Sequence, residues 1–170
     1  RWGEVRMKDE DKNFLRVEVG GLVRDHRENP VVLLKGIDDD EVLPIWIGQA
    51  EALAIDLQLK GESFDRPLTH DLLKTAVESL GASVLRVAVT ELRDNTFFAK
   101  IFIQRGNEVF AIDARPSDSI ALAMRTQSPI YVSKDVFDGH KHSMEGKEMS
   151  DVDTDEDLRK YLRDLDPGEF

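Results

Sequence analysis

Apolar and polar positions alternate in short runs along much of this chain, and a period of two is typical of β-strands. Two such runs near the start, 14–25 and 29–37, are rich in valine and leucine, and the Arg-Glu-Asn-Pro sequence between them predicts a turn. Compact turn sequences later in the chain predict an antiparallel meander. The further predicted strands run through Trp46 and over 83–92, 96–105, 108–113 and 128–133.

After the early strands, the sequence predicts two helices that each end at a glycine, over 48–61 and 65–81. In the second segment, Thr69 is the predicted N-cap and Asp71 lies in the first turn, where the helix dipole favours an anion. A third predicted helix follows Asp113 and runs to about residue 126.

The last predicted helix, 154–166, is amphipathic, with Thr154 and Asp157 approximating a capping box. Its apolar stripe repeats at helical spacing. The stripe consists of Leu158, Tyr161, Leu162 and Leu165.

Together these elements predict an α+β fold with a mixed, largely antiparallel sheet, packed helices and a C-terminal amphipathic helix. A strand–break–helix unit occurs twice, in LPIWIGQAEALAIDL and FAIDARPSDSIALAM, which suggests an internal β-α duplication. Both helices are apolar on most sides, so we expect burial on two sides, with a second subunit as one source of the cover. The predicted organisation is a domain over 14–137, a flexible polar linker over 138–153 and an acidic C-terminal helix and tail over 154–170.

Charge changes this picture because the 170-residue chain carries a net −11. Residues 135–170 hold twelve acidic and five basic side chains, and so account for −7 of that total. The acidity argues against a broad phosphate-neutralising surface. Residues 56–125, with nine basic and ten acidic side chains, are almost neutral and leave room for a local basic cleft.

Two composition features exclude whole classes of chemistry. The chain has no cysteine, which removes disulfides, thiolate metal sites and cysteine nucleophiles, and fits a cytoplasmic location. No apolar run approaches the ~18 residues that a membrane span needs, so we expect no membrane association. Glycine-rich phosphate loops and nucleophile elbows are also missing from the sequence, so we expect no organic cofactor.

The candidate chemistry lies in two similar motifs, RPLTHD at 66–71 and RPSDS at 115–119. A proline at the first helical position, a hydroxyl and an acid are what any helix start prefers. Capping does not require the arginines, and a guanidinium beside a helix N-terminus makes an anion site. The predicted substrate-binding residues are therefore Arg66, Thr69, Arg115 and Ser117.

Acidic residues and one histidine in these motifs suggest catalysis. Asp113 and Asp118 could face one cleft and hold Mg²⁺ or Mn²⁺ through carboxylate oxygens. His70 could act as a general base or acid, with Asp71 orienting it. The alternative is purely structural, with Asp118 capping its helix and Asp113 pairing with Arg115.

Three long stretches resemble the bifunctional nuclease domain family: NPVVLLKGIDDDEVLPIWIGQAEALAI, RPLTHDLLKTAVESLGASVLRVAVTELRDNTFFAKI and IDARPSDSIALAMRTQSPIYVS. The resemblance covers about residues 15–137. It implies a compact α+β fold, self-association as a homodimer or larger homo-oligomer, and metal-assisted hydrolysis of phosphodiester bonds in DNA and RNA.

Two hypotheses of function follow from these patterns. The first is an oligomeric nuclease in which Asp113 and Asp118 hold the metal, Arg115 and Arg66 bind phosphate, and His70 with Asp71 transfers protons. The second is a non-catalytic regulatory or interaction module that uses the same positions to bind an anionic ligand or a protein partner. A mainly structural oligomer is a third possibility.

Overall fold

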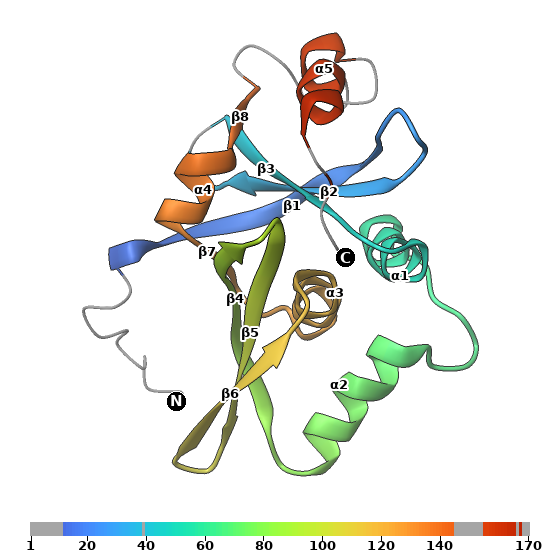
Figure 1. Ribbon diagram of the computed structural model, residues 1–170. Helices are drawn as coiled ribbons and strands as arrows, with labels where there is room; N and C mark the ends of the chain where they lie inside the picture. Colours follow the sequence, from blue (N-terminus) through green and yellow to red (C-terminus); the bar gives the residue numbers. More distant parts are fainter. Residues whose placement is uncertain (1–11, 39, 145–154, 166, 168–170) are drawn as a thin grey trace.

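The computed structural model describes residues 12–38, 40–144, 155–165 and 167, and its strands form one eight-stranded mixed sheet (Figure 1). The strands are β1 (Phe14–Arg24), β2 (Pro30–Gly36), β3 (Glu41–Trp46), β4 (Ser83–Arg93), β5 (Thr96–Arg105), β6 (Glu108–Ala114), β7 (Ile130–Ser133) and β8 (His142–Ser143). The helices are α1 (Gln49–Lys60), α2 (Thr69–Ser79), α3 (Pro116–Thr126), α4 (Lys134–His140) and α5 (Glu156–Asp164).

The sheet consists of two antiparallel meanders, β1-β2-β3 and β4-β5-β6, joined through β7 in the order β6-β5-β4-β7-β1-β2-β3-β8. Of the strand pairs that the structure describes, β4 and β7 alone are parallel. In Figure 1 the first meander runs across the view and the second runs down it. Each meander leads into a helix, α1 after β3 and α3 after β6, so the β-α repeat seen in the sequence corresponds to a repeated arrangement. The predicted α+β class and the predicted meander are confirmed.

The main core lies between one face of the sheet and helices α1, α3 and α4. Alternation along β5 sends Ala99, Ile101 and Ile103 into this core, where they meet buried residues of α3 such as Ile120 and Leu122. A smaller cluster lies on the opposite face of the first meander, where α5 covers it. This cluster comprises Val23, Val31, Leu33, Val42, Trp46, Met144, Leu158 and Leu162.

The turn between β1 and β2 is organised by the buried carboxylate of Asp25. It accepts hydrogen bonds from the backbone N–H groups of Arg27 and Asn29 and from Trp46 Nε1, at 2.8, 2.9 and 2.9 Å. Burial raises the pKa of Asp25, but these hydrogen bonds outweigh it and lower the pKa to about 2. The predicted turn is therefore held by a side chain that stays ionised down to acid pH.

Some predicted boundaries are corrected. Thr69 is the first residue of α2 rather than its cap, because Leu68 precedes the helix and donates its N–H to Asp71 Oδ2 at 2.9 Å. The N-cap of α5 is Asp155, whose side chain accepts from the N–H groups of Asp157 and Leu158. Thr154, the predicted cap, lies outside the described residues.

The predicted flexible linker at 138–153 begins inside the fold. Its first residues complete α4, and the next ones form β8, which pairs with β3. A short helix of seven residues gives little periodic signal, which is why the sequence pattern missed α4. Residues 145–154 lie outside the described residues. Among the described helices, none is both long and apolar enough to cross a membrane.

Candidate active site

Helices α1, α2 and α3 pack against one another, and the first turns of α2 and α3 meet. There the His70 ring, 10% exposed, places Nε2 2.8 Å from Asp118 Oδ1. The two Arg-Pro motifs, 48 residues apart at this contact, therefore come together in space. Because helix N-termini carry partial positive charge, this junction favours anions.

Asp118 is shared between the histidine and an arginine. Its second oxygen, Oδ2, accepts from Arg115 Nε at 2.9 Å. Burial raises the pKa of Asp118, but the hydrogen bonds from Arg115 and His70 prevail and lower it. The carboxylate is therefore ionised at neutral pH and can only accept hydrogen bonds. In its hydrogen bond with His70, the donor is the Nε2–H group of the ring.

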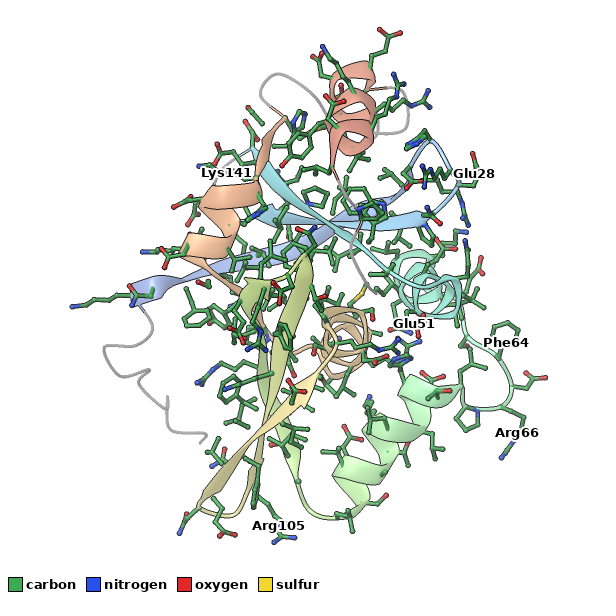
Figure 2. All side chains as sticks on the ribbon, viewed as in Figure 1. Glu28, Glu51, Phe64, Arg66, Arg105 and Lys141 are labelled. Carbon is green, nitrogen blue, oxygen red and sulfur yellow. The ribbon has the colours of Figure 1, made fainter. Side chains whose placement is uncertain are left out.

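Arg115 also bonds Glu51 of α1, with one terminal nitrogen 2.8 Å from Glu51 Oε1. Its hydrogen bonds with Asp118 and Glu51 raise the pKa of Arg115, so the guanidinium stays charged. Glu51 belongs to the first turn of α1, and Figure 2 shows it on the side of that helix toward α2 and α3. Sequence reasoning missed Glu51, although an acid in the first turn of the helix in the first repeat unit, matching Asp118 in the second, was the available signal.

Gly48 leaves room for that carboxylate. A Cβ atom at residue 48 would collide with Glu51 Oε2, so any larger residue there would push the Glu51 side chain from its place. The glycine before α1 therefore serves the ion pair between α1 and α3.

A second ion pair joins the same three helices from the other end of α3. Arg125 Nε donates to Asp71 Oδ1 at 2.7 Å, and its terminal nitrogens donate to the carbonyls of Ala121 and Ala54, each at 3.0 Å. Burial raises the pKa of Asp71, but hydrogen bonds from Leu68 N–H and Arg125 lower it overall. The predicted role of Asp71 in orienting His70 is thus corrected: the carboxylate that bonds the ring is Asp118.

Asp113 does not join this cluster. It lies on β6 opposite Lys100, which shares the face of β5 that points away from the core residues Ala99 and Ile101. The Asp113 side chain is exposed there, whereas Asp118 lies with α3 on the core side. Across the described parts of the chain, no three histidine or carboxylate side chains gather in a way that could hold a metal ion. The arrangement therefore does not fit the predicted Asp113–Asp118 metal pair.

The remaining predicted residues are dispersed. Arg66 is exposed on the loop between α1 and α2, and its side chain points away from the body of the protein (Figure 2). Thr69 is exposed at the start of α2, close in sequence to His70. Ser117 is 6% exposed in the first turn of α3.

The cluster keeps unused hydrogen-bonding capacity. Within the described residues, His70 bonds Asp118 through Nε2, and Nδ1 makes no hydrogen bond. Arg115 is 53% exposed and has N–H groups beyond those that bond Asp118 and Glu51. A histidine whose Nδ1 bonds no described residue, beside an exposed guanidinium, offers a proton acceptor and an anion-binding group.

Comparisons with known proteins show what this chain is similar to. A family model described as bifunctional nuclease domain matches residues 32–145. The chain is 44% identical over 119 residues to the uncharacterized protein Rv1829 of Mycobacterium tuberculosis (strain ATCC 25618 / H37Rv), covering 70% of this chain and 71% of that protein.

Plant relatives carry the same type of domain in longer proteins. Bifunctional nuclease 1 of Arabidopsis thaliana is 31% identical over 119 residues, which is 68% of this chain and 37% of the plant protein. Bifunctional nuclease 1 of Oryza sativa subsp. indica is 28% identical over 137 residues, which is 76% of this chain and 41% of that protein. The chain thus spans less than half the length of these plant relatives.

Proposed function

Since this chain belongs to the bifunctional nuclease domain family, we propose that it is a nuclease that hydrolyses phosphodiester bonds at the His70–Asp118–Arg115 cluster. The observation that carries the proposal is the 2.8 Å contact between His70 Nε2 and Asp118 Oδ1, with Arg115 on the other oxygen of the same carboxylate. This contact unites two motifs whose arginines capping does not require.

In the proposed reaction, His70 is the general base. Asp118 fixes the tautomer and ring orientation through Nε2, which leaves the Nδ1 lone pair to take a proton from an attacking water. The water oxygen forms a bond to phosphorus and the bond from phosphorus to the leaving oxygen breaks. That oxygen takes up a proton from solvent, and His70 returns the proton it accepted to solvent.

Arg115 supplies electrostatic stabilisation. Its exposed N–H groups would bind a non-bridging phosphate oxygen and stabilise the charge that grows there in the transition state. Asp118 and Glu51 hold the guanidinium in a fixed orientation, so it is preorganised before substrate arrives. Because the acids of the cluster do not form a metal site, no step of this mechanism passes through a metal ion.

Cleavage assays test this proposal. We expect labelled single-stranded and duplex DNA and RNA to be cut by the wild type, and His70→Gln and Asp118→Asn each to lower the rate by about 10²-fold or more. Assays in Mg²⁺, Mn²⁺ and EDTA measure any metal requirement separately. Circular dichroism checks folding, and Lys74→Gln on α2 is a control for surface charge. Cleavage that persists at the wild-type rate in both variants would overturn the assignment.

A protein-binding role is the second candidate, and exposed apolar side chains favour it. Leu72 of α2 is 60% exposed, and Leu80, which directly follows that helix, is 73% exposed. Phe110 and Ile112 of the edge strand β6 are 42% and 45% exposed. Such residues are candidates to meet a protein partner or a second copy of this chain. Sedimentation of the wild type and of Leu80→Glu tests it, with a lower mass for the variant as the expected result.

A further inference from the structure

The sheet has a second surface that the candidate site does not use. Helices α2 and α3 lie on one side of β4 and β5 (Figure 1). Among the helices that the structure describes, α5 covers the opposite side, and it does so at the first meander. Val87, Val89 and Ile101 point into the core. Because side chains alternate along a strand, the residues next to them point to the opposite side of the sheet. We call the remaining part of that opposite side, on β1, β7, β4 and β5, the outer face.

Basic and aromatic side chains interleave on the outer face. The guanidinium of Arg86 lies 4.2 Å from the Phe102 ring centroid, that of Arg93 lies 4.4 Å from Phe98, and that of Arg16 lies 5.9 Å from Tyr131. Lys100 lies between Phe98 and Phe102 on β5 and is exposed. Strand register sets Tyr131 beside Ala88 and Ala88 beside Lys100, so a small residue separates the ring from the ammonium group.

The charge of the outer face differs from that of the chain. Its four basic side chains are Arg16, Arg86, Arg93 and Lys100, in a protein with 34 acidic and 23 basic residues. Three acids accompany them: Glu91 lies opposite Phe98 and pairs with Arg93 at 3.8 Å, Asp113 lies opposite Lys100 on the edge strand β6, and Glu18 lies on β1 beyond its pairing with β7. Four basic side chains thus stand against three acidic ones, in contrast to the acidic excess of the whole chain.

We propose that the outer face binds single-stranded nucleic acid. Phe98 and Phe102 are four residues apart on one strand, about 14 Å, and Tyr131 lies two strands away, about 10 Å. Aromatic rings and guanidinium planes on a sheet stack unpaired bases, and basic side chains among them contact the phosphates. Paired bases are already stacked inside a duplex, so the rings select single strands. The inference goes beyond the proposed nuclease function, because binding here needs no cleavage.

Binding measurements on the full chain test this proposal. The probes are fluorescein-labelled single-stranded oligo-dT and oligo-rU of twelve nucleotides in EDTA, followed by fluorescence anisotropy, with a twelve-base-pair duplex for comparison. We expect saturable binding of the single strands and at least ~10-fold weaker binding of the duplex. Equal binding of single strands and duplex, or no saturable binding at low salt, would overturn it.

Matched variants place the ligand on one face. Lys100→Glu should weaken binding about 10-fold and reduce the slope of log affinity against log salt by at least ~0.7, the value for one phosphate contact. Phe102→Ala should weaken binding by a similar factor. The controls, Arg105→Glu and Phe110→Ala, alter a cation and an aromatic ring 5.8 Å apart on the core side of the same hairpin and should stay within twofold of the wild type.

The outcomes separate this proposal from the nuclease. Binding that is lost in Lys100→Glu but kept in His70→Gln supports the outer face even if no cleavage is ever seen. Cleavage with equal binding by Lys100→Glu and Arg105→Glu would overturn the outer face while leaving the nuclease intact. A change of sedimenting mass in Lys100→Glu and Phe102→Ala, without a change in nucleic-acid affinity, would assign the face to a protein contact instead and overturn the proposal.

Discussion

Arg115 and Arg125 lie at opposite ends of α3. Arg125 links that helix directly to α1 and α2, whereas Arg115 links it to α1 and reaches α2 only through Asp118, which bonds His70. Arg125 is 4% exposed and bonds Asp71 together with two backbone carbonyls, so its guanidinium is enclosed by partners. Arg115 is 53% exposed and bonds two carboxylates while part of its guanidinium faces solvent. Arg125 therefore holds the helices together at the C-terminal end of α3, whereas Arg115 forms an open anion site at the N-terminal end.

This difference in exposure separates an arginine that stabilises the fold from one that can bind a ligand. A buried arginine whose hydrogen bonds all end on protein stabilises the packing and has nothing left for a ligand. An exposed arginine held by carboxylates keeps its orientation and has N–H groups left to bind a ligand. Its exposed ion pairs add little to the stability of the protein. Variants at the two positions should therefore change different properties.

Arg125→Ala should have the largest effect on stability. Removing a buried guanidinium leaves the Asp71 carboxylate without its cation and leaves a cavity among three helices, so we expect a loss of about 3 kcal/mol in the free energy of unfolding. Urea denaturation followed by circular dichroism measures it. The matched variant Arg115→Ala should lose no more than about 1 kcal/mol, and equal losses in the two variants would remove the distinction.

Arg115→Ala should instead have the larger effect on activity. We expect cleavage to fall about 10²-fold because the transition-state charge loses a preorganised donor. Arg115→Lys should recover only part of the rate, because an ammonium group cannot bond two carboxylates and a phosphate in one planar arrangement. Single-turnover cleavage assays measure both rates. An unchanged rate in a folded Arg115→Ala protein would contradict the role assigned to this residue.

Acid titration gives a smaller effect that sharpens the comparison. The lowered pKa of Asp71 means that the folded state holds its ionised form more strongly than the unfolded state does. This contribution to stability is present above about pH 4 and is lost as pH falls through the lower folded-state pKa. Asp71→Asn should cost about 1 kcal/mol at neutral pH, and its difference from the wild type should shrink below pH 4 in urea titrations. A difference that stays constant down to pH 2 would show that the charge of Asp71 is not what matters.

Glu51→Gln should have the smallest effect. A neutral amide can still accept from Arg115, so we expect stability within about 0.5 kcal/mol of the wild type and a loss of activity of about threefold. Gly48→Ala should act in the same direction, because the new methyl group displaces the Glu51 carboxylate. Comparing the two variants in the cleavage assay tests whether the position of Arg115 depends on Glu51. A 10²-fold loss in Glu51→Gln would instead place Glu51 in direct contact with the reaction.

The site was only partly readable from the sequence. The two Arg-Pro motifs identified Arg115, His70 and Asp118 because cap chemistry left the arginines unexplained. Asp113 was misplaced because β6 has apolar residues at 109–112, so alternation could not show which side of that strand faces the core. Arg125 was overlooked because a basic residue in the last turn of a helix is also what the helix dipole favours.

By itself, the sequence determined the strands of both meanders, the starts of α2 and α3 to within a few residues, and the apolar stripe of α5. These features depend on neighbours a few residues apart, through side-chain alternation, proline at the first helical position and capping. The tertiary structure alone decided that His70 meets Asp118 across 48 residues and that Arg125 meets Asp71 across 54. Which cation reaches which carboxylate depends on how three helices pack on a twisted sheet, and no local pattern encodes that packing.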